Sequence, residues 1–115
     1  MPAEKVLEKT GTSVTLEIVI PPGSEYFDGH FPEFKLLPGV AQLELVVRLA
    51  SRYLGTGIYV PSAKRVKFSA AIRPGAALRL ELSYTVEKHA LAFKIASSNG
   101  AIVYSAGTLT ISGEL

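Results

Sequence analysis

One stretch of the chain, between residues 40 and 54, has the hydrophobic spacing of a helix. Apolar side chains recur there at steps of three and four residues, as on one face of a helix: Val40, Leu43, Val47, Ala50 and Leu54. Further apolar residues fill most of the remaining circumference, and a helix of that kind is normally buried. The exception is a narrow polar line, formed by Glu44, Arg48, Ser51 and Arg52. The pattern predicts one long buried helix.

Alternating apolar and polar residues predict strands on both sides of this helix. Before it, residues 13–20 alternate clearly and residues 5–9 more weakly, so the two runs can pair across the turn between them. Gly55 is expected to end the helix. After it come strand-like runs at residues 63–72, 77–87, 90–97 and 101–111. Asn99-Gly100 is a two-residue hairpin signal, so these later runs are expected to form an antiparallel meander.

These elements predict an α+β fold in a single domain over residues 1–115. One flat sheet cannot cover a helix that is apolar on most sides, whereas a strongly curved sheet can wrap it. The expected architecture is one long central helix wrapped by a curved antiparallel sheet of five to six strands. A second copy of the chain could bury what the sheet leaves uncovered, so a dimer is expected.

Composition narrows the classes of function. The chain has 115 residues, 48% hydrophobic and 19% charged, which is typical of a globular domain. A net charge of +2 without a basic run gives no reason to expect a nucleic-acid partner. The absence of cysteine excludes disulfides and thiolate chemistry. The first residues do not form a secretory signal, and no window is apolar enough to span a membrane, so a soluble cytoplasmic protein is expected.

Residues 29–44, GHFPEFKLLPGVAQLE, resemble the active-site segment of the hot-dog-fold (3R)-3-hydroxyacyl-[acyl carrier protein] dehydratases. His-Phe-Pro at residues 30–32, Pro-Gly-Val at residues 38–40 and an acid on the helix, Glu44, follow in that family's order and spacing. The wording Pro-Gly-Val-Ala-Gln-Leu looks most like the small dehydratases associated with aryl polyene and related lipid clusters. The segment therefore points to a dehydratase fold and activity.

This resemblance implies dehydration of a 3-hydroxyacyl-[acyl carrier protein] to the trans-2-enoyl product, in fatty acid or related polyene lipid biosynthesis. It implies no cofactor and no metal. The acyl carrier protein would be the partner, and the enzyme would be a homodimer with shared active sites, on which a higher oligomer could be built. His30 of one subunit would then face Glu44 of the other.

The residue types suit that chemistry. A neutral imidazole is a suitable base near pH 7, so His30 would remove the C2 proton. Glu44, in an apolar helix, could have its pKa raised enough to protonate the departing hydroxide. The backbone N–H groups of Gly39 and Val40, at the helix N-terminus, suit the negative charge on the thioester oxygen. Phe31 and Pro38 are the further candidates for substrate binding.

Other readings of the same residues stay open. Glu44 and Arg48 are four residues apart in the favourable order, so they could form a plain helix salt bridge. The protein could then be a non-catalytic acyl-binding subunit. It could also be a thioesterase, because that class shares the fold and places a carboxylate on the central helix. A basic group could receive the acidic carrier protein or form a solvated surface, and its members are Lys64, Arg65, Lys67 and Arg52.

Overall fold

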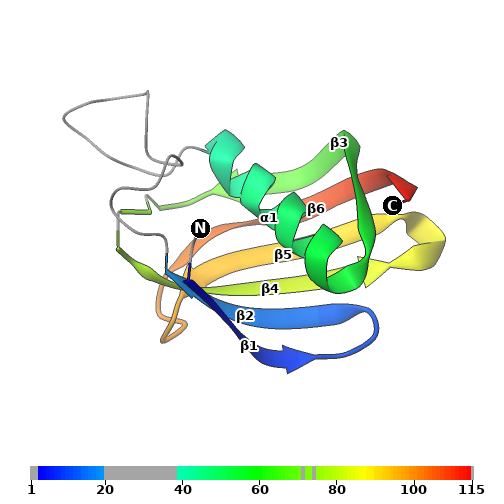
Figure 1. Ribbon diagram of the computed structural model, residues 1–115. Coiled ribbons are helices and arrows are strands. Elements are labelled where there is room, and N and C mark those ends of the chain that lie inside the picture. Colours follow the sequence, from blue (N-terminus) through cyan, green and yellow to red (C-terminus); the bar gives the residue numbers. More distant parts are fainter. Residues whose placement is uncertain (1–2, 20–38, 71, 74, 115) are drawn as a thin grey trace.

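In the computed structural model, which describes residues 3–19, 39–70, 72–73 and 75–114, one helix packs on one face of a six-stranded antiparallel sheet (Figure 1). The elements in chain order are β1 (Ala3–Lys9), β2 (Ser13–Val19), α1 (Gly39–Leu54), β3 (Thr56–Phe68), β4 (Ala77–Thr85), a 3-10 turn (Val86–Lys88), β5 (Ala90–Ser97) and β6 (Val103–Glu114). The expected α+β architecture is confirmed.

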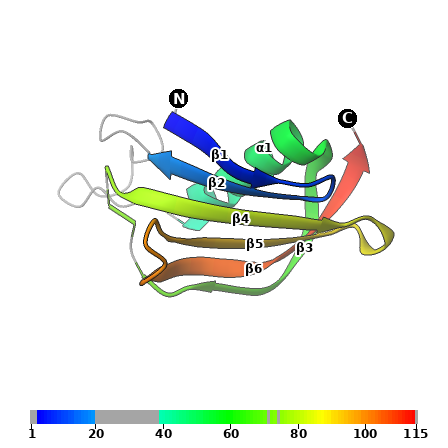
Figure 2. The same cartoon turned by 90° about the horizontal axis from the view of Figure 1, so that it is seen from below.

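The strands lie in the order β1-β2-β4-β5-β6-β3, and every neighbouring pair is antiparallel (Figure 2). The predicted pairing of the first two strands is confirmed. The predicted four-stranded meander is wrong, because only β4, β5 and β6 follow one another in space. β3 pairs instead with β6 at the far edge, where Ala63 lies opposite Leu109 and Phe68 opposite Ser105. Alternation along a strand reports its two faces and carries no information about its neighbours.

β3 begins earlier than the hydrophobic pattern predicted. α1 ends at Leu54, and Gly55 has a φ of 69°, so the expected helix stop is confirmed. The chain enters β3 directly at Thr56, seven residues before the predicted start at Ala63. Pro61 lies inside the strand, and this is tolerated because β3 is the last strand of the sheet and pairs only with β6 among the described residues.

The connection between β5 and β6 spans residues 98–102 and is therefore longer than the two-residue hairpin that Asn99-Gly100 predicted. The side-chain oxygen Oδ1 of Asn99 accepts a hydrogen bond from the Ala101 N–H at 2.9 Å. Gly100 has a φ of 77°, and the Ser97 N–H bonds to the Ile102 carbonyl at 2.8 Å. The Asn99 side chain thus accepts a backbone hydrogen bond within the turn. Asn residues can stabilise a longer turn in this way, in place of the backbone hydrogen bonds of a two-residue hairpin.

The core lies between α1 and the face of the sheet that α1 covers. Alternate residues of the strands point into it, and its members are Val14, Leu16, Ile18, Leu78, Leu80, Leu82, Leu91, Phe93, Ile95, Leu109 and Ile111. From α1 the sheet buries Leu45, Val46, Leu49 and Ala50. Leu43 and Val47 remain only partly buried, so the helix is buried on one face and not on nearly all sides as expected. This leaves an apolar strip of α1 beside β3.

Candidate active site

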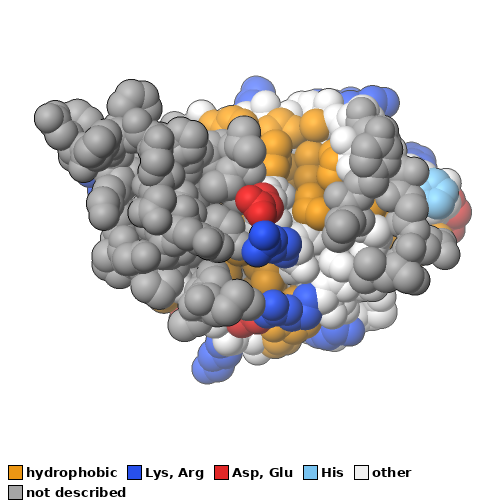
Figure 3. Space-filling view, turned by 45° about the horizontal axis from the view of Figure 1, so that its top comes forward, with side chains coloured by type: hydrophobic (Ala, Val, Ile, Leu, Met, Phe, Trp, Pro, Cys, Tyr) orange, Lys and Arg blue, Asp and Glu red, His pale blue; other side chains and the backbone are white. Residues whose placement is uncertain are grey.

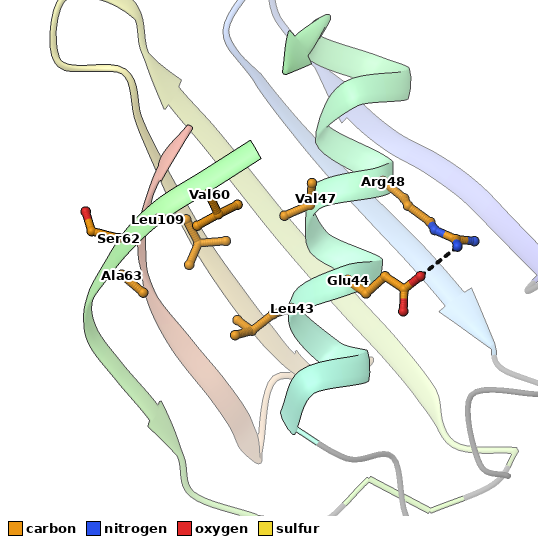
Figure 4. Close-up of a pocket in the computed structure, with 8 residues that line it drawn as sticks. All are labelled: Leu43, Glu44, Val47, Arg48, Val60, Ser62, Ala63 and Leu109. Atoms are coloured by element: carbon orange, nitrogen blue, oxygen red, sulfur yellow. Dashed lines mark hydrogen bonds and ion pairs between the residues drawn. The ribbon is translucent and has the colours of Figure 1, made fainter. Parts of the chain in front are cut away.

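An open cavity of about 620 Å³ lies along α1 and β3. Its lining residues are Leu43, Glu44, Val47, Arg48, Val60, Ser62, Ala63 and Leu109. Figure 4 shows Leu43 and Val47 pointing from α1 across the cavity toward β3. A cavity of this size with mostly apolar walls is typical of a small-molecule site. We call it the α1–β3 groove; its lining suits an acyl chain.

Glu44 and Arg48 form an ion pair at the rim of the α1–β3 groove. The Arg48 Nη2 donates to Glu44 Oε1 at 2.6 Å, and the two side chains are 55% and 49% exposed respectively. Figure 4 shows both leaving α1 on the side away from β3. On the surface, hydrophobic side chains lie next to acidic and basic ones on this face (Figure 3). The helix salt bridge that the four-residue spacing allowed is therefore present.

The N-terminus of α1 is the second polar feature of this region. The helix begins at Gly39, as the Pro-Gly-Val sequence predicted, and its first turn carries no acidic side chain. The first N–H groups of a helix have no partner within it and favour an anion. The oxyanion role of Gly39 and Val40 stays a prediction.

Three further sequence candidates, His30, Phe31 and Pro38, lie outside the described residues. Their catalytic and binding roles, and the approach of His30 to Glu44, therefore stay predictions. The described part of the site consists of the carboxylate of Glu44, the start of α1 and the apolar walls of the groove.

The four basic candidates for carrier binding do not gather in one place. Lys64, Arg65 and Lys67 are exposed on β3, where a register shift interrupts the pairing with β6 and Arg65 takes a φ of 57°. Arg52 lies in the last turn of α1, and its Nη1 donates to Oε1 of Glu4 in β1. β1 and β3 are opposite edges of the sheet. Carrier binding by the β3 cations stays a prediction, and Arg52 stands apart from them.

Sequence reasoning did not identify the partners of Arg52. Glu4 binds it from β1, and Tyr53 lies beside both. Burial raises the pKa of the Tyr53 phenol, and the charge of Glu4 and its hydrogen bond to Tyr53 raise it further, while Arg52 acts in the opposite direction. Glu4 is 48 residues before Arg52, so no local pattern could have revealed the pair.

Within the described ranges, no group of three or more His, Cys, Asp or Glu side chains could hold a metal ion. The same residues contain no helix with the length and hydropathy needed to cross a membrane.

The fold is that of the hot-dog proteins. The chain superposes on the dehydratase heterocomplex ApeI:P from Xenorhabdus doucetiae with a TM-score of 0.86, at 28% identity, covering 98% of this chain and 99% of that one. It superposes on an uncharacterized protein from Erwinia carotovora subsp. atroseptica with a TM-score of 0.80, at 32% identity, covering 97% of this chain and 96% of that one. A hypothetical thioesterase from Streptococcus pneumoniae shares the fold alone, with a TM-score of 0.65 at 11% identity. The superposition covers 97% of this chain and 88% of that one.

Within that class the chain belongs to the ApeI-like dehydratase family, whose model matches residues 6–107. It is 30% identical over 95 residues to the 3-hydroxyacyl-[acyl-carrier-protein] dehydratase FabZ of Ligilactobacillus salivarius, covering 76% of this chain and 61% of that protein. It is 32% identical over 85 residues to FabZ of Lactobacillus helveticus, covering 68% of this chain and 56% of that protein. The chain thus spans about three-fifths of the length of these curated relatives. The family indicated by residues 29–44 is confirmed.

Proposed function

We propose that this protein dehydrates (3R)-3-hydroxyacyl groups on acyl carrier protein to trans-2-enoyl groups, in fatty acid or related polyene lipid biosynthesis. The observation that carries the proposal is the position of Glu44, a carboxylate on α1 at the rim of an apolar groove, in a chain of the ApeI-like dehydratase family. The FabZ relatives support the same reaction class.

In the proposed reaction His30 takes the proton from C2 of the substrate. The electron pair forms the C2–C3 double bond, and the C3–O bond breaks. Glu44, as the carboxylic acid, donates its proton to the leaving hydroxide, so that one water leaves. The negative charge on the thioester oxygen is met by the N–H groups of Gly39 and Val40 at the start of α1.

The spacing along α1 supports this division of roles. Glu44 is five residues after Gly39, which is about 7.5 Å along the helix axis at 1.5 Å per residue. A 3-hydroxy thioester with one hydrogen bond at its carbonyl and one at its hydroxyl covers a comparable length. One substrate could therefore engage the helix N-terminus and Glu44 together.

A second hot-dog subunit completes the site in this proposal. Figure 4 shows Glu44 leaving α1 away from β3, while Leu43 and Val47 are left partly buried in the α1–β3 groove. A homodimer would cover these apolar residues and present His30 of one subunit to Glu44 of the other. The solved relative from Xenorhabdus doucetiae is a heterocomplex, so a related second chain is the other candidate partner.

The carrier protein would approach along β3. Lys64, Arg65 and Lys67 are exposed, and none of them has an ion-pair partner among the described residues. Clustered cations attract an acidic partner and raise its rate of association. They lie on the strand that also supplies Val60 and Ala63 to the groove, which suits delivery of a carrier-bound acyl chain.

The direct test follows the mass of a short 3-hydroxyacyl carrier protein incubated with the purified protein and with its His30→Ala variant. Loss of one water, abolished in the variant while its fold is retained, is the expected result. Release of free carrier thiol would instead identify a thioesterase. Unchanged substrate, with short and polyene acyl chains alike, would remove the dehydratase proposal.

The shared site has its own test. His30→Ala and Glu44→Ala chains are each expected to be inactive, whereas a verified mixed dimer contains one intact pair and should recover activity. The recovery should reach about half of the wild-type activity per dimer, because one of two sites is rebuilt. Verified mixed dimers without activity would contradict a site built from two subunits.

The ion pair at Glu44 favours one alternative function, that of a non-catalytic acyl-binding subunit. If Arg48, at 2.6 Å, keeps Glu44 ionised, the carboxylate has no proton to donate. The protein would then bind an acyl group without dehydrating it. In the catalytic proposal Arg48 binds Oε1 and leaves Oε2 for the substrate. Arg48→Gln then loosens the carboxylate and lowers kcat by about threefold to tenfold. Activity gained only on this substitution would favour the binding subunit.

A further inference from the structure

The edge of the sheet at β1 carries apolar side chains that the described chain leaves uncovered. β1 is the first strand in sheet order and pairs with β2 alone among the described strands, and Figure 2 shows it along the rim. Val6 and Leu7, at its centre, are 41% and 42% exposed. An edge strand also presents unpaired backbone N–H and C=O groups, which another strand can use. β1 therefore has the backbone and the apolar centre that strand addition needs.

A bulge in β1 decides which face each charged side chain occupies. The register against β2 shifts between Val6 and Glu8, which leaves an extra residue in β1. Lys5 precedes the shift and lies opposite Glu17, while Glu8 follows it and lies opposite Thr15. Glu17 and Thr15 are on the face of the sheet that α1 does not cover, because the residues alternating with them are buried. Lys5 and Glu8 thus share one face although they are three residues apart.

Two copies of β1 match in charge when they lie antiparallel about a two-fold axis between Val6 and Leu7. In that register Lys5 lies opposite Glu8 of the partner subunit, and the symmetry repeats this pair. Directly opposite residues must share a face of the sheet, and the bulge puts Lys5 and Glu8 on the same one. The exposed Val6 and Leu7 lie next to this axis, Val6 on the face that α1 covers and Leu7 at the bulge, so both would come close to the partner subunit at the centre of the contact.

The ends of β1 fit the same register. Glu4 lies opposite Ile18 and Lys9 opposite Val14, which are both buried, so these two charged residues share the face that α1 covers. Glu4 would then face Lys9 of the partner subunit. Because Glu4 already binds Arg52, this outer pair is the weaker part of the match.

Charges and bulges also occur on edge strands that avoid association. Charges of one sign achieve this by repelling a second copy. β1 instead has two acidic and two basic residues, in an order that is complementary to its own reverse: Glu4, Lys5, Glu8 and Lys9. We propose that β1 is a self-association edge, along which a second copy of this chain adds its own β1, separately from the α1–β3 groove.

The test measures mass by light scattering over a range of protein concentrations. The wild-type mass should rise with concentration above that of the Lys5→Glu and Glu8→Lys variants. Each single substitution turns both symmetric ion pairs into like-charge pairs, so the dissociation constant should rise about tenfold or more. A wild-type mass equal to that of both variants at every concentration would overturn the proposal.

Charge exchange makes the test specific for this register. An equimolar mixture of Lys5→Glu and Glu8→Lys chains has opposite charges in both pairs, and so does the double variant Lys5→Glu/Glu8→Lys. Both samples should recover the wild-type mass. Failure of both to recover it, with folding verified by circular dichroism, would contradict the pairing of Lys5 with Glu8 of the partner subunit.

Matched controls come from the centre of the sheet. Glu81→Lys and Lys94→Glu change a pair of charges on β4 and β5 that are each 49% exposed, and they should leave the mass unchanged. The β1 variants should also retain the dehydratase activity of the wild type, because they leave α1 and its groove intact. A protein without that activity would still show the mass changes, so failure of the proposed function and failure of this interface are distinguishable.

Discussion

The two ion pairs on the polar line of α1 have the same chemistry but different surroundings. In the middle of the helix, Arg48 binds Glu44 within α1, and both side chains are about half exposed. In the last turn, Arg52 binds Glu4 of β1, whose side chain is only 18% exposed. The first pair joins two residues of one helix, whereas the second joins the helix to the edge of the sheet.

This difference distinguishes the Glu44 pair, which borders the candidate active site, from the Glu4 pair, which is a structural contact. An exposed pair within one helix contributes little to stability, so the position of Glu44 beside the α1–β3 groove is available for chemistry. A partly buried pair between distant elements contributes more, because its loss leaves a poorly hydrated charge. We therefore expect substitutions at the two carboxylates to affect different properties.

The largest effect is expected at Glu44. Glu44→Gln keeps the shape of the side chain but removes its proton-donating carboxyl group. kcat should therefore fall by about 100-fold or more, while the free energy of unfolding changes by less than about 0.5 kcal/mol. Product mass spectrometry and urea unfolding on the same sample measure the two quantities. A stability loss as large as the catalytic one would remove the distinction between the two pairs.

Substitution of Leu49 tests the apolar packing of α1 on the sheet, on which both ion pairs depend. Its side chain is 3% exposed and packs α1 on the sheet between the two pairs. Leu49→Ala should lower the free energy of unfolding by about 3 kcal/mol, through lost burial and the cavity that remains. Urea unfolding measures this loss. A loss below about 1 kcal/mol would mean that α1 is held chiefly by its polar contacts.

Glu4→Gln is the counterpart of the Glu44 variant. It removes the charge that binds Arg52, so the free energy of unfolding should fall by about 1 kcal/mol, a value that allows for the 46% exposure of Arg52. Dehydratase activity at a temperature well below unfolding should be unchanged. Loss of activity in a fully folded Glu4→Gln protein would show that the last turn of α1 also acts on the site.

The smallest effect concerns the pH dependence of the second pair. Burial and Glu4 raise the pKa of Tyr53 above its ordinary value of 10.0, so the folded state holds the phenol proton more tightly than the unfolded state. The resulting stability is fully present below about pH 10 and is lost as the pH rises further. Tyr53→Phe should therefore lose less stability than wild type between pH 9 and 11 in urea unfolding. Equal slopes for the two proteins would contradict this contribution.

Much of the fold was predictable because it follows from local patterns. The start of α1 at Gly39, its end before Gly55 and the strand Ala90–Ser97 agree with the sequence analysis. The predicted neighbours of β3 were wrong, since pairing with β6 depends on where α1 delivers the chain. The hairpin at Asn99 was mispredicted because its side chain satisfies the turn in place of the backbone.

The sequence by itself determined the family, the start of the helix and the pair of Glu44 with Arg48, because each depends on residues close together in the chain. Only the tertiary structure decided that Arg52 binds Glu4, which is 48 residues away, and that Leu43 and Val47 border an open groove. The physical reason is range. Spacing along a helix specifies contacts within one turn or two, whereas contacts between a helix and separate strands depend on the packing of the whole sheet beneath it.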